Sequence, residues 1–458
     1  MNYTRRKSSV VRIGNIEMGG QNPIRVQSMT TTSTDDTEAS VAQAKRIIDA
    51  GGELVRLTTQ GRREAENLKN ISAALKKDGY DAPLVADVHF NANVADVAAQ
   101  YAEKVRINPG NYVDPARTFK HLEYTDEEYA AELQKIDERL MPFIRICKEH
   151  HTAVRIGVNH GSLSDRIMSR YGDTPEGIVE SCMEFLRIFK REQFDDVVIS
   201  IKASNTVVMV QSVRLLVQQM DREGMCYPLH LGVTEAGEGE DGRIKSAVGI
   251  GALLTEGIGD TIRVSLSEEP EAEIPVAKAL VGMIEECAAL RAEAEASIVD
   301  DTITLNIDAE DWPTLQLKAA MAVGALLIDR KATKLIIKSK IDNSPYNQLL
   351  ADAILQAARI KFTKTEYISC PGCGRTLYDL RTTIARIKEA TKDMVGLKIG
   401  IMGCIVNGPG EMADADYGYV GAGPGKISLY KQKVCVEKNI PEAEAVEKLL
   451  ELIRNDRK

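Results

Sequence analysis

The chain has 458 residues, more than one ordinary domain needs, and 44% of them are hydrophobic, so it can bury substantial cores. Its net charge of -9 at pH 7 argues against a general nucleic-acid binder, although arginines gathered by the fold can still bind a small anion. We expect a cytoplasmic protein with no membrane partner and no disulfides. The chain shows no secretory signal pattern, and its longest apolar run, 319–328, is too short to span a bilayer.

A repeating pattern fills residues 1–290: a short apolar, β-branched segment, then a polar loop, then an amphipathic helical stretch. The predicted strands lie at 24–29, 54–57, 84–89, 105–110, 154–159, 197–202, 229–235 and 261–266. Eight strand–helix units whose strands are apolar on both faces predict a parallel (β/α)8 TIM barrel within an α/β fold. Charged helical sequence at 127–147 lengthens one connection beyond what a barrel needs, which predicts an extra helix there.

Polar side chains stand near the C-terminal ends of these predicted strands, where barrel active sites are built. Burying several cations together is unfavourable without a multiply anionic partner, and guanidinium groups bind diphosphate oxygens in pairs. A solvated surface charge is the usual alternative for any single arginine. The basic residues are Arg56, Arg106, Arg155, Lys202 and Arg263. Donors, acceptors and candidate proton carriers at the same rim are Asp87, His89, Asn159, His230 and Glu235.

Two smaller units follow the predicted barrel. Residues 291–364 predict a short α/β insert, with strands at 302–307 and 334–338, helices at 315–327 and 348–359, and no catalytic constellation. Residues 365–458 predict a small α/β domain, with strands at 365–369 and 397–402 and helices at 379–392 and 442–454. The glycine-rich stretch 421–426 predicts a hairpin turn, because it lacks the spacing of a phosphate-binding loop. The acidic stretch 238–242 predicts a solvated turn, with a mobile lid as the alternative.

Two cysteine motifs follow the last two predicted strands: residues 370–373 read CPGC and residues 403–411 read GCIVNGPGE. Neither a second cysteine pair nor a histidine follows Cys373, so the four ligands of a closed zinc site are missing from this region. Three thiolates at unequal spacing suit an iron-sulfur cluster with one weakly held position, for which Glu411 is the candidate ligand. A zinc knuckle, or buried cysteines without metal, is the alternative.

Six segments together resemble the family of 4-hydroxy-3-methylbut-2-enyl diphosphate synthases, the IspG-type iron-sulfur enzymes of non-mevalonate (MEP) isoprene biosynthesis. These segments are VQSMT at 26–30, RINPG at 106–110, RIGVN at 155–159, TEAG at 234–237 and the two cysteine motifs. The resemblance implies a 4Fe-4S cluster bound by Cys370, Cys373, Cys404 and, reversibly, Glu411. It also implies an oxidoreductase that opens 2-C-methyl-D-erythritol 2,4-cyclodiphosphate by a two-electron reduction with loss of water. A flavodoxin or ferredoxin would supply the electrons.

The resemblance also assigns roles within the predicted site. The substrate-binding residues would be Ser28, Arg56, Asp87, Arg106, Arg155, Asn159, Lys202, His230, Arg263 and Ser265. The residues that act on the reaction itself, through the cluster or by proton delivery, would be Glu411, Glu235, His89 and Asn407.

The middle of the chain departs from both known forms of the family. The chain has the barrel extension of the longer, plant-like form, but its insert is too short to be a second barrel. We therefore expect a homodimer in which the cluster domain of one subunit caps the barrel of its partner. Two other functions remain open: a different iron-sulfur barrel enzyme acting on a phosphorylated or pterin-like substrate, and a non-enzymatic binding module that holds structural zinc.

Overall fold

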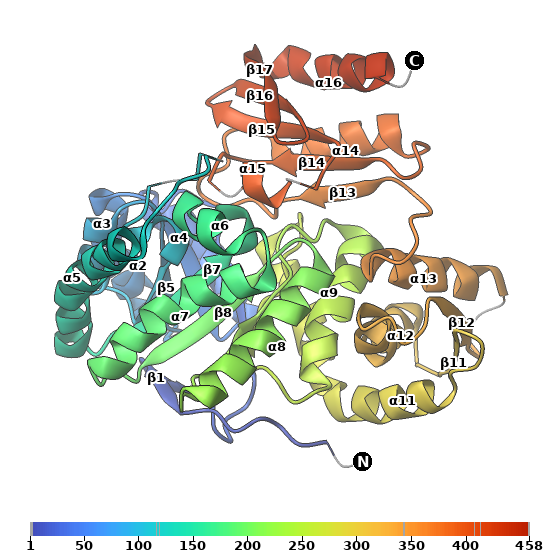
Figure 1. Ribbon diagram of the computed structural model, residues 1–458, viewed down its shortest axis with the longest axis horizontal. Helices are drawn as coiled ribbons and strands as arrows, with labels where there is room; N and C mark the ends of the chain where they lie inside the picture. Colours follow the sequence, from blue (N-terminus) through green and yellow to red (C-terminus); the bar gives the residue numbers. More distant parts are fainter. Residues whose placement is uncertain are drawn as a thin grey trace.

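Eight parallel strands form a barrel, as predicted (Figure 1). The structure is a computed structural model and describes residues 3–456 except 116, 119, 342, 343, 407 and 413. The strands pair in the order β8-β7-β6-β5-β4-β3-β10-β9, and a parallel bridge between Ile199 and Leu229 closes the ring. Their bounds are β3 (Arg25–Met29), β4 (Leu54–Thr59), β5 (Leu84–Val88), β6 (Lys104–Ile107), β7 (Ala153–Asn159), β8 (Val197–Lys202), β9 (His230–Leu231) and β10 (Thr261–Ile262).

Three barrel strands are shorter than the sequence predicts by two residues or more. Strand β6 ends at Ile107 because Pro109 begins the short helix α4, whose first turn is capped by the Asn108 side chain accepting a hydrogen bond from the Gly110 amide at 3.1 Å. Strands β9 and β10 have only two paired residues each. After β9 the chain turns sharply, and Glu235 has left-handed backbone geometry (φ 49°). The side chains that follow these strands therefore lie in loops at the barrel mouth.

Helices surround the barrel and connect its strands. They are α1 (Thr37–Asp49), α2 (Arg62–Lys77), α3 (Ala92–Ala98), α4 (Pro109–Tyr112), α5 (Asp126–His150), α6 (Asp165–Tyr171), α7 (Pro175–Arg191), α8 (Thr206–Arg222), α9 (Gly239–Leu254), α10 (Glu273–Gly282) and α11 (Ile284–Ala296), with 3-10 turns η1 (His160–Ser162) and η2 (Pro270–Ala272). Helix α5 is the predicted extra helix, and it begins with a capping box formed by Thr125 and Glu128. The prediction of a turn at 238–242 is wrong. This segment begins α9, where acidic side chains in the first turn favour a helix N-terminus.

An N-terminal hairpin closes the bottom of the barrel. Strands β1 (Val11–Ile13) and β2 (Ile16–Met18) pair with each other and pack their buried side chains against residues at the beginnings of barrel strands. The sequence alone did not indicate this hairpin, because each strand has only three residues. Since this end is covered, the C-terminal ends of the barrel strands are the end where a ligand can enter.

The insert forms a compact unit on the flank of the barrel. It contains β11 (Thr302–Asn306), α12 (Trp312–Ile328), β12 (Lys334–Lys338) and α13 (Ser344–Ala357), close to the predicted elements. Strands β11 and β12 pair in parallel. Helices α12 and α13 both pack against α9, and Figure 1 shows α13 leading toward the domain above the barrel. Nearly all of α12 is buried, as expected for a helix covered on both sides.

The C-terminal domain is a five-stranded sheet with helices beside it. Its elements are β13 (Glu366–Ser369), α14 (Leu380–Thr391), β14 (Lys398–Met402), α15 (Gly408–Glu411), β15 (Tyr417–Gly423), β16 (Lys426–Lys431), β17 (Val434–Pro441) and α16 (Glu442–Asp456). The sheet order is β13-β14-β15-β16-β17. Gly423 pairs with Lys426 across the tight turn between β15 and β16, which confirms the predicted hairpin turn. We call residues 365–456 the cap.

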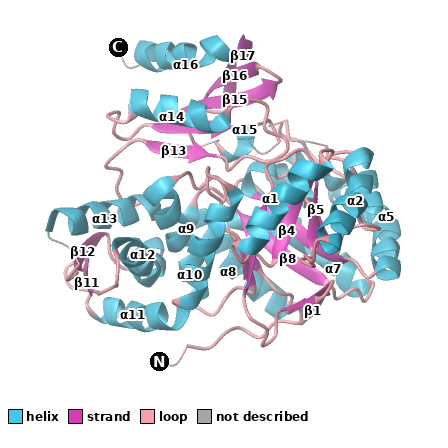
Figure 2. Cartoon of the chain, turned by 180° about the vertical axis from the view of Figure 1, so that it is seen from behind, coloured by secondary structure: helices cyan, strands magenta, loops and turns pink. Residues whose placement is uncertain are grey.

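The cap sits over the mouth of the barrel in its own chain (Figures 1 and 2). Ser369 at the end of β13 forms a parallel bridge with Ala236 on the barrel rim. Gly161 and Gly410 bring the two backbones so close that any side chain at Gly410 would overlap the Gly161 carbonyl. The expectation that the cap covers a partner's barrel is therefore wrong for this structure. The insert lies along α9 and brings β13 to the rim of the same barrel. The homodimer itself stays a prediction.

Among the described residues, none of the helices combines the length and the apolar composition needed to cross a bilayer.

Candidate active site

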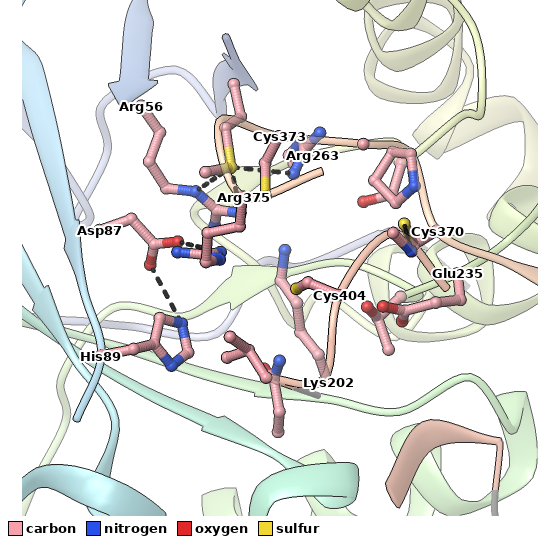
Figure 3. Close-up of a pocket in the computed structure, with 18 of the residues that line it drawn as sticks. Arg56, Asp87, His89, Lys202, Glu235, Arg263, Cys370, Cys373, Arg375 and Cys404 are labelled. Atoms are coloured by element: carbon pink, nitrogen blue, oxygen red, sulfur yellow. Dashed lines mark hydrogen bonds and ion pairs between the residues drawn. The ribbon is translucent and has the colours of Figure 1, made fainter. Parts of the chain in front are cut away.

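One cavity lies between the barrel mouth and the cap, and both parts of the chain line it (Figure 3). Most of the predicted site residues meet there, although they come from distant segments. Those that line it are Arg56, Asp87, His89, Arg106, Arg155, Asn159, Lys202, Glu235, Arg263, Ser265, Cys370, Cys373 and Cys404. Most of the barrel residues stand near or just after the C-terminal ends of its strands, as expected for a barrel active site, whereas Arg56 and Arg155 lie in the body of β4 and β7 and line the cavity from there.

Asp87 organises one side of the cavity. Its Oδ1 atom accepts a hydrogen bond from Nη1 of Arg106 at 2.8 Å, and Arg106 also donates to the Gly157 carbonyl at 2.9 Å. Burial alone would raise the pKa of Asp87, but the positive charges of Arg56 and Arg106 outweigh it and hold the pKa well below its usual value. Asp87 is therefore an ionised carboxylate that orients arginines, and His89 also contacts Arg106.

Arg263 is held by a carboxylate that the sequence did not indicate. Glu273 at the start of α10 accepts hydrogen bonds from Arg263 Nε at 2.9 Å and Nη2 at 3.0 Å. The Ser28 hydroxyl donates to the same carboxylate at 2.7 Å and lies outside the cavity lining. The prediction that Ser28 binds substrate is therefore corrected. Successive side chains of a strand point to opposite faces, so Ser28 points out toward the helices while Met29 points into the barrel.

Three described cations of the cavity form no ion pair, although Asp87 lies near enough to act on Arg56 and Arg155. Among the described residues, no carboxylate oxygen lies within 4.0 Å of Arg56, Arg155 or Lys202. The Nε and Nη1 atoms of Arg155 are buried and have no hydrogen-bond partner there. Burial, followed by repulsion from neighbouring cations, lowers the pKa of Lys202 and Arg155 well below the usual values, and burial lowers that of Arg56 to about 9. An anion in the cavity would relieve both the repulsion and the missing hydrogen bonds.

His230 is another predicted residue that does not line the cavity. His230 is fully buried in the barrel interior, where its Nδ1 atom lies 3.4 Å from the Thr261 hydroxyl, so the prediction that it binds substrate is corrected. It stands on the paired part of β9, one layer below the residues at the strand ends. Asn407 lies outside the described residues.

The cap contributes three cysteines to the cavity. Cys370 follows β13 and accepts a hydrogen bond from the Gly403 amide at 3.3 Å, while the amide of Cys373 donates to the Thr376 hydroxyl at 3.0 Å. Burial raises the pKa of the thiols of Cys370 and Cys404. Within the described ranges, no three His, Cys, Asp or Glu side chains are close enough together to hold one metal ion. Thiols spread around one cavity are a donor set suited to a polynuclear iron-sulfur group.

The two predicted glutamates lie at the border between cap and barrel. The carboxylate of Glu411 accepts hydrogen bonds from the backbone amides of Gly161 and Ser204, each at 3.1 Å, and lies outside the cavity lining. It therefore faces the barrel rim in this structure. Burial, and then the charge of Glu411, raises the pKa of Glu235 to about 8. Glu235 is thus protonated at neutral pH and can act as a proton donor.

Arg375 is a cavity residue that the sequence interpretation missed. It follows the CPGC motif by two residues, and its Nη2 atom forms an ion pair with Asp87 Oδ2 at 3.1 Å. Figure 3 shows it between Asp87 and Cys373. The proximity of an arginine to the cysteine motif was a usable signal. The sequence interpretation places the cations of the site only at the ends of barrel strands.

Comparison with known proteins identifies the family. The model of the GcpE TIM-barrel domain matches residues 8–278, and the model of the GcpE protein C-terminal domain matches residues 366–455. A relative from Bacteroides fragilis, named 4-hydroxy-3-methylbut-2-en-1-yl diphosphate synthase (flavodoxin), is 54% identical over 602 positions, covering 99% of this chain and 96% of the relative. Proteins of the same name are 53% identical in Bacteroides thetaiotaomicron (100% of this chain, 99% of the relative) and 45% identical in Porphyromonas gingivalis (99% and 98%).

These alignments also bear on the insert. The alignment with the Bacteroides fragilis relative spans 602 positions, whereas this chain has 458 residues, so that relative contains well over a hundred residues without a counterpart here. The region between the two matched domains, 279–365, is covered by neither domain model. On the family matches and these identities, this chain belongs to the GcpE family.

Proposed function

We propose that this chain reduces 2-C-methyl-D-erythritol 2,4-cyclodiphosphate to 4-hydroxy-3-methylbut-2-enyl diphosphate, the product that appears in the names of its relatives. One observation carries this proposal: a single cavity has uncompensated cations on the barrel side and three cysteine thiols on the cap side. The cations suit a diphosphate and the thiols suit a redox group, so binding and reduction can take place in one enclosed space.

The cysteine side of the cavity fits a 4Fe-4S cluster. Cys370, Cys373 and Cys404 would hold it, and the Gly403 amide that donates to Cys370 is the kind of hydrogen bond that stabilises ligating sulfur. When bound, such a cluster supplies electrons and a Lewis-acidic iron. The resemblance makes Glu411 the fourth ligand. To take that role, its carboxylate would have to give up its hydrogen bonds to Gly161 and Ser204.

The barrel side would bind and orient the substrate. Arg56, Arg155 and Lys202 would take up the charge of the diphosphate, because no carboxylate among the described residues competes for them. Arg106 and Arg263 already have carboxylate partners, so their guanidinium groups are held in place before substrate arrives. Asn159 and Ser265 offer further hydrogen bonds.

We call the cations that would bind the diphosphate the anion clamp. The proton would come from groups that lie between this clamp and the cap. Glu235 carries a proton at neutral pH because of its raised pKa, and it lines the cavity together with Cys370. His89 is neutral, since burial and then Arg106 lower its pKa well below the usual value, so it is the weaker candidate donor. Asn407 would also take part in proton delivery, as the resemblance to the family implies. The cap would exclude water during reduction.

Partners and domains complete the proposal. A flavodoxin, named for the relatives, or a ferredoxin would deliver electrons, and the chain would act in the cytoplasm as a homodimer. The domains would be the barrel at 1–290, the insert at 291–364 and the cluster domain at 365–458.

Turnover by the anaerobically purified protein tests the proposal. A brown protein that contains iron and sulfide, and that forms the linear allylic diphosphate with a strong one-electron reductant, is the expected result. Cys404→Ala should lose iron and activity. Cys435→Ala is the matched control, because Cys435 also lies in the cap but does not line this cavity. A colourless zinc protein, or a brown one inert toward this substrate, would contradict the proposal.

A further inference from the structure

Arg375 differs from the other cations of the cavity because the cap contributes it. Among the described residues that line the cavity, the remaining cationic side chains all belong to the barrel. The Arg375 side chain is only 9% exposed, and it crosses the interface to pair with Asp87. In Figure 3 it lies between Cys373 and Asp87, the carboxylate on which the charges of Arg56 and Arg106 act. A cation from the cap therefore stands beside the cations of the barrel.

The donors of Arg375 are only partly used. Its Nη2 atom is bonded to Asp87, but Nε and Nη1 are buried without a hydrogen-bond partner among the described residues. Buried N–H groups of a charged side chain are strongly unfavourable when left unpaired. Asp87 does not supply the missing acceptor: its oxygens accept from Arg106 Nη1 and Arg375 Nη2, and neither bonds Nε or Nη1 of Arg375. Besides the thiols of Cys373 and Cys404, which lie near Arg375, the remaining acceptor for these donors is one that enters the cavity from outside the protein.

Pairing with Asp87 also fixes where these donors point. Asp87 holds Arg106 through one oxygen and Arg375 through the other, so one carboxylate joins a barrel arginine to the cap arginine. This geometry exists only when the cap is seated on the barrel. The position of the free donors consequently depends on cap closure.

We propose that Arg375 binds an oxygen of the substrate diphosphate through Nε and Nη1, so that the anion clamp is complete only when the cap is closed. This inference rests on the proposed function for the identity of the anion. Since closure places Arg375 in the clamp, anion binding stabilises the closed cap to the same extent that closure strengthens anion binding.

The chain offers a matched control in Arg381. This arginine also belongs to the cap and crosses the same interface, pairing with Glu269 on the barrel rim. Both members of that pair are nearly half exposed, at 44% and 49%, and Arg381 does not line the cavity. Removing Arg381 therefore takes away a cap–barrel ion pair but leaves the clamp intact.

The test uses the full chain, purified anaerobically, with inorganic diphosphate as the probe. Isothermal titration measures its affinity, and limited proteolysis with and without diphosphate measures cap closure. Wild type should bind diphosphate and gain protection. In Arg375→Gln, affinity should fall by roughly tenfold to a hundredfold, the range for loss of charge-assisted hydrogen bonds, and the protection should disappear. Arg375→Lys keeps a positive charge for Asp87 but lacks the several fixed N–H donors of a guanidinium, so this variant should also bind diphosphate more weakly.

Arg381→Gln should change affinity by no more than about twofold, as is usual for an exposed ion pair. Wild-type affinity in Arg375→Gln, equal losses in the two glutamine variants, or loss of iron from Arg375→Gln would each overturn the inference. If Arg375→Gln does not fold, wild-type affinity in Arg375→Lys overturns it instead. Failure of the proposed function is a separate result: wild type and Arg375→Gln would differ in diphosphate affinity, yet wild type would not convert the cyclic diphosphate.

Discussion

Replacing Gly157 by alanine tests the position of Arg106 without removing its charge. An alanine methyl at this point of β7 would overlap Nε of Arg106 and lie only 3.0 Å from its Cγ atom. The guanidinium would have to move by roughly 1 Å to regain ordinary contacts. That movement breaks the bonds from Arg106 to Asp87 and to the Gly157 carbonyl, now 2.8 and 2.9 Å long. Overpacking of a buried site and the weakened charged bonds together should lower the free energy of unfolding by about 2–4 kcal/mol.

Urea unfolding followed by circular dichroism measures this loss, and titration with inorganic diphosphate measures the clamp. Diphosphate affinity should fall at least about tenfold, because a displaced Arg106 no longer matches the anion and no longer orients Asp87. Gly282→Ala is the control, since a methyl group there meets open space and the glycine φ is not positive. Wild-type affinity in Gly157→Ala, or an equal loss in Gly282→Ala, would refute the role given to Arg106.

Three further predictions concern the ion pair of Glu273, the position of the cap and the protonation of His160. Glu273→Gln leaves the buried guanidinium of Arg263 without its bidentate countercharge, so the free energy of unfolding in urea should fall by about 3 kcal/mol. An unchanged value would show that the pair of Arg263 with Glu273 is not formed. Arg155→Met damages the barrel side of the cavity and Cys404→Ala damages its cap side. Because each cap covers its own barrel, the two variants should stay inactive when they are co-expressed. Recovered turnover would demonstrate capping between chains. Burial opposes protonation of His160, but its hydrogen bond to Asp173 raises the pKa above 6.5. The stability advantage of wild type over His160→Gln should therefore be full below pH 6.5 and disappear as pH rises through the raised pKa, and a pH-independent difference in urea unfolding would contradict it.

The barrel and the thiol set could be predicted from the sequence because both leave local patterns. Runs such as 197–202 are apolar on both faces, and the CPGC motif places two sulfurs on one tight turn. Which strand residues face inward could not be predicted in the same way. A barrel strand is buried on both sides, so hydrophobic alternation does not distinguish Ser28, which holds Glu273, from Met29, which lines the cavity.

Contacts between distant segments were beyond the reach of the sequence. The ion pair of Arg375 with Asp87 joins residues 288 positions apart, and it depends on how the insert packs against α9 and presents β13 to the barrel rim. The shortened insert suggested capping by a partner subunit, because no length rule says that two βα units suffice to place the cap on its own barrel. Glu411 illustrates the same point: its carboxylate contacts barrel amides more than 200 positions away.

We propose that one cavity binds the diphosphate of the substrate on its barrel side and breaks the reacting carbon–oxygen bond by reduction on its cysteine side. An anaerobic crystal structure of the iron-loaded protein with the cyclic diphosphate tests this most directly. We expect phosphate oxygens within hydrogen-bond distance of Arg56 and Arg155, with the reacting carbon–oxygen bond facing Cys370, Cys373 and Cys404. Substrate bound elsewhere, or bound in the cavity with its phosphates toward the thiols, would contradict it.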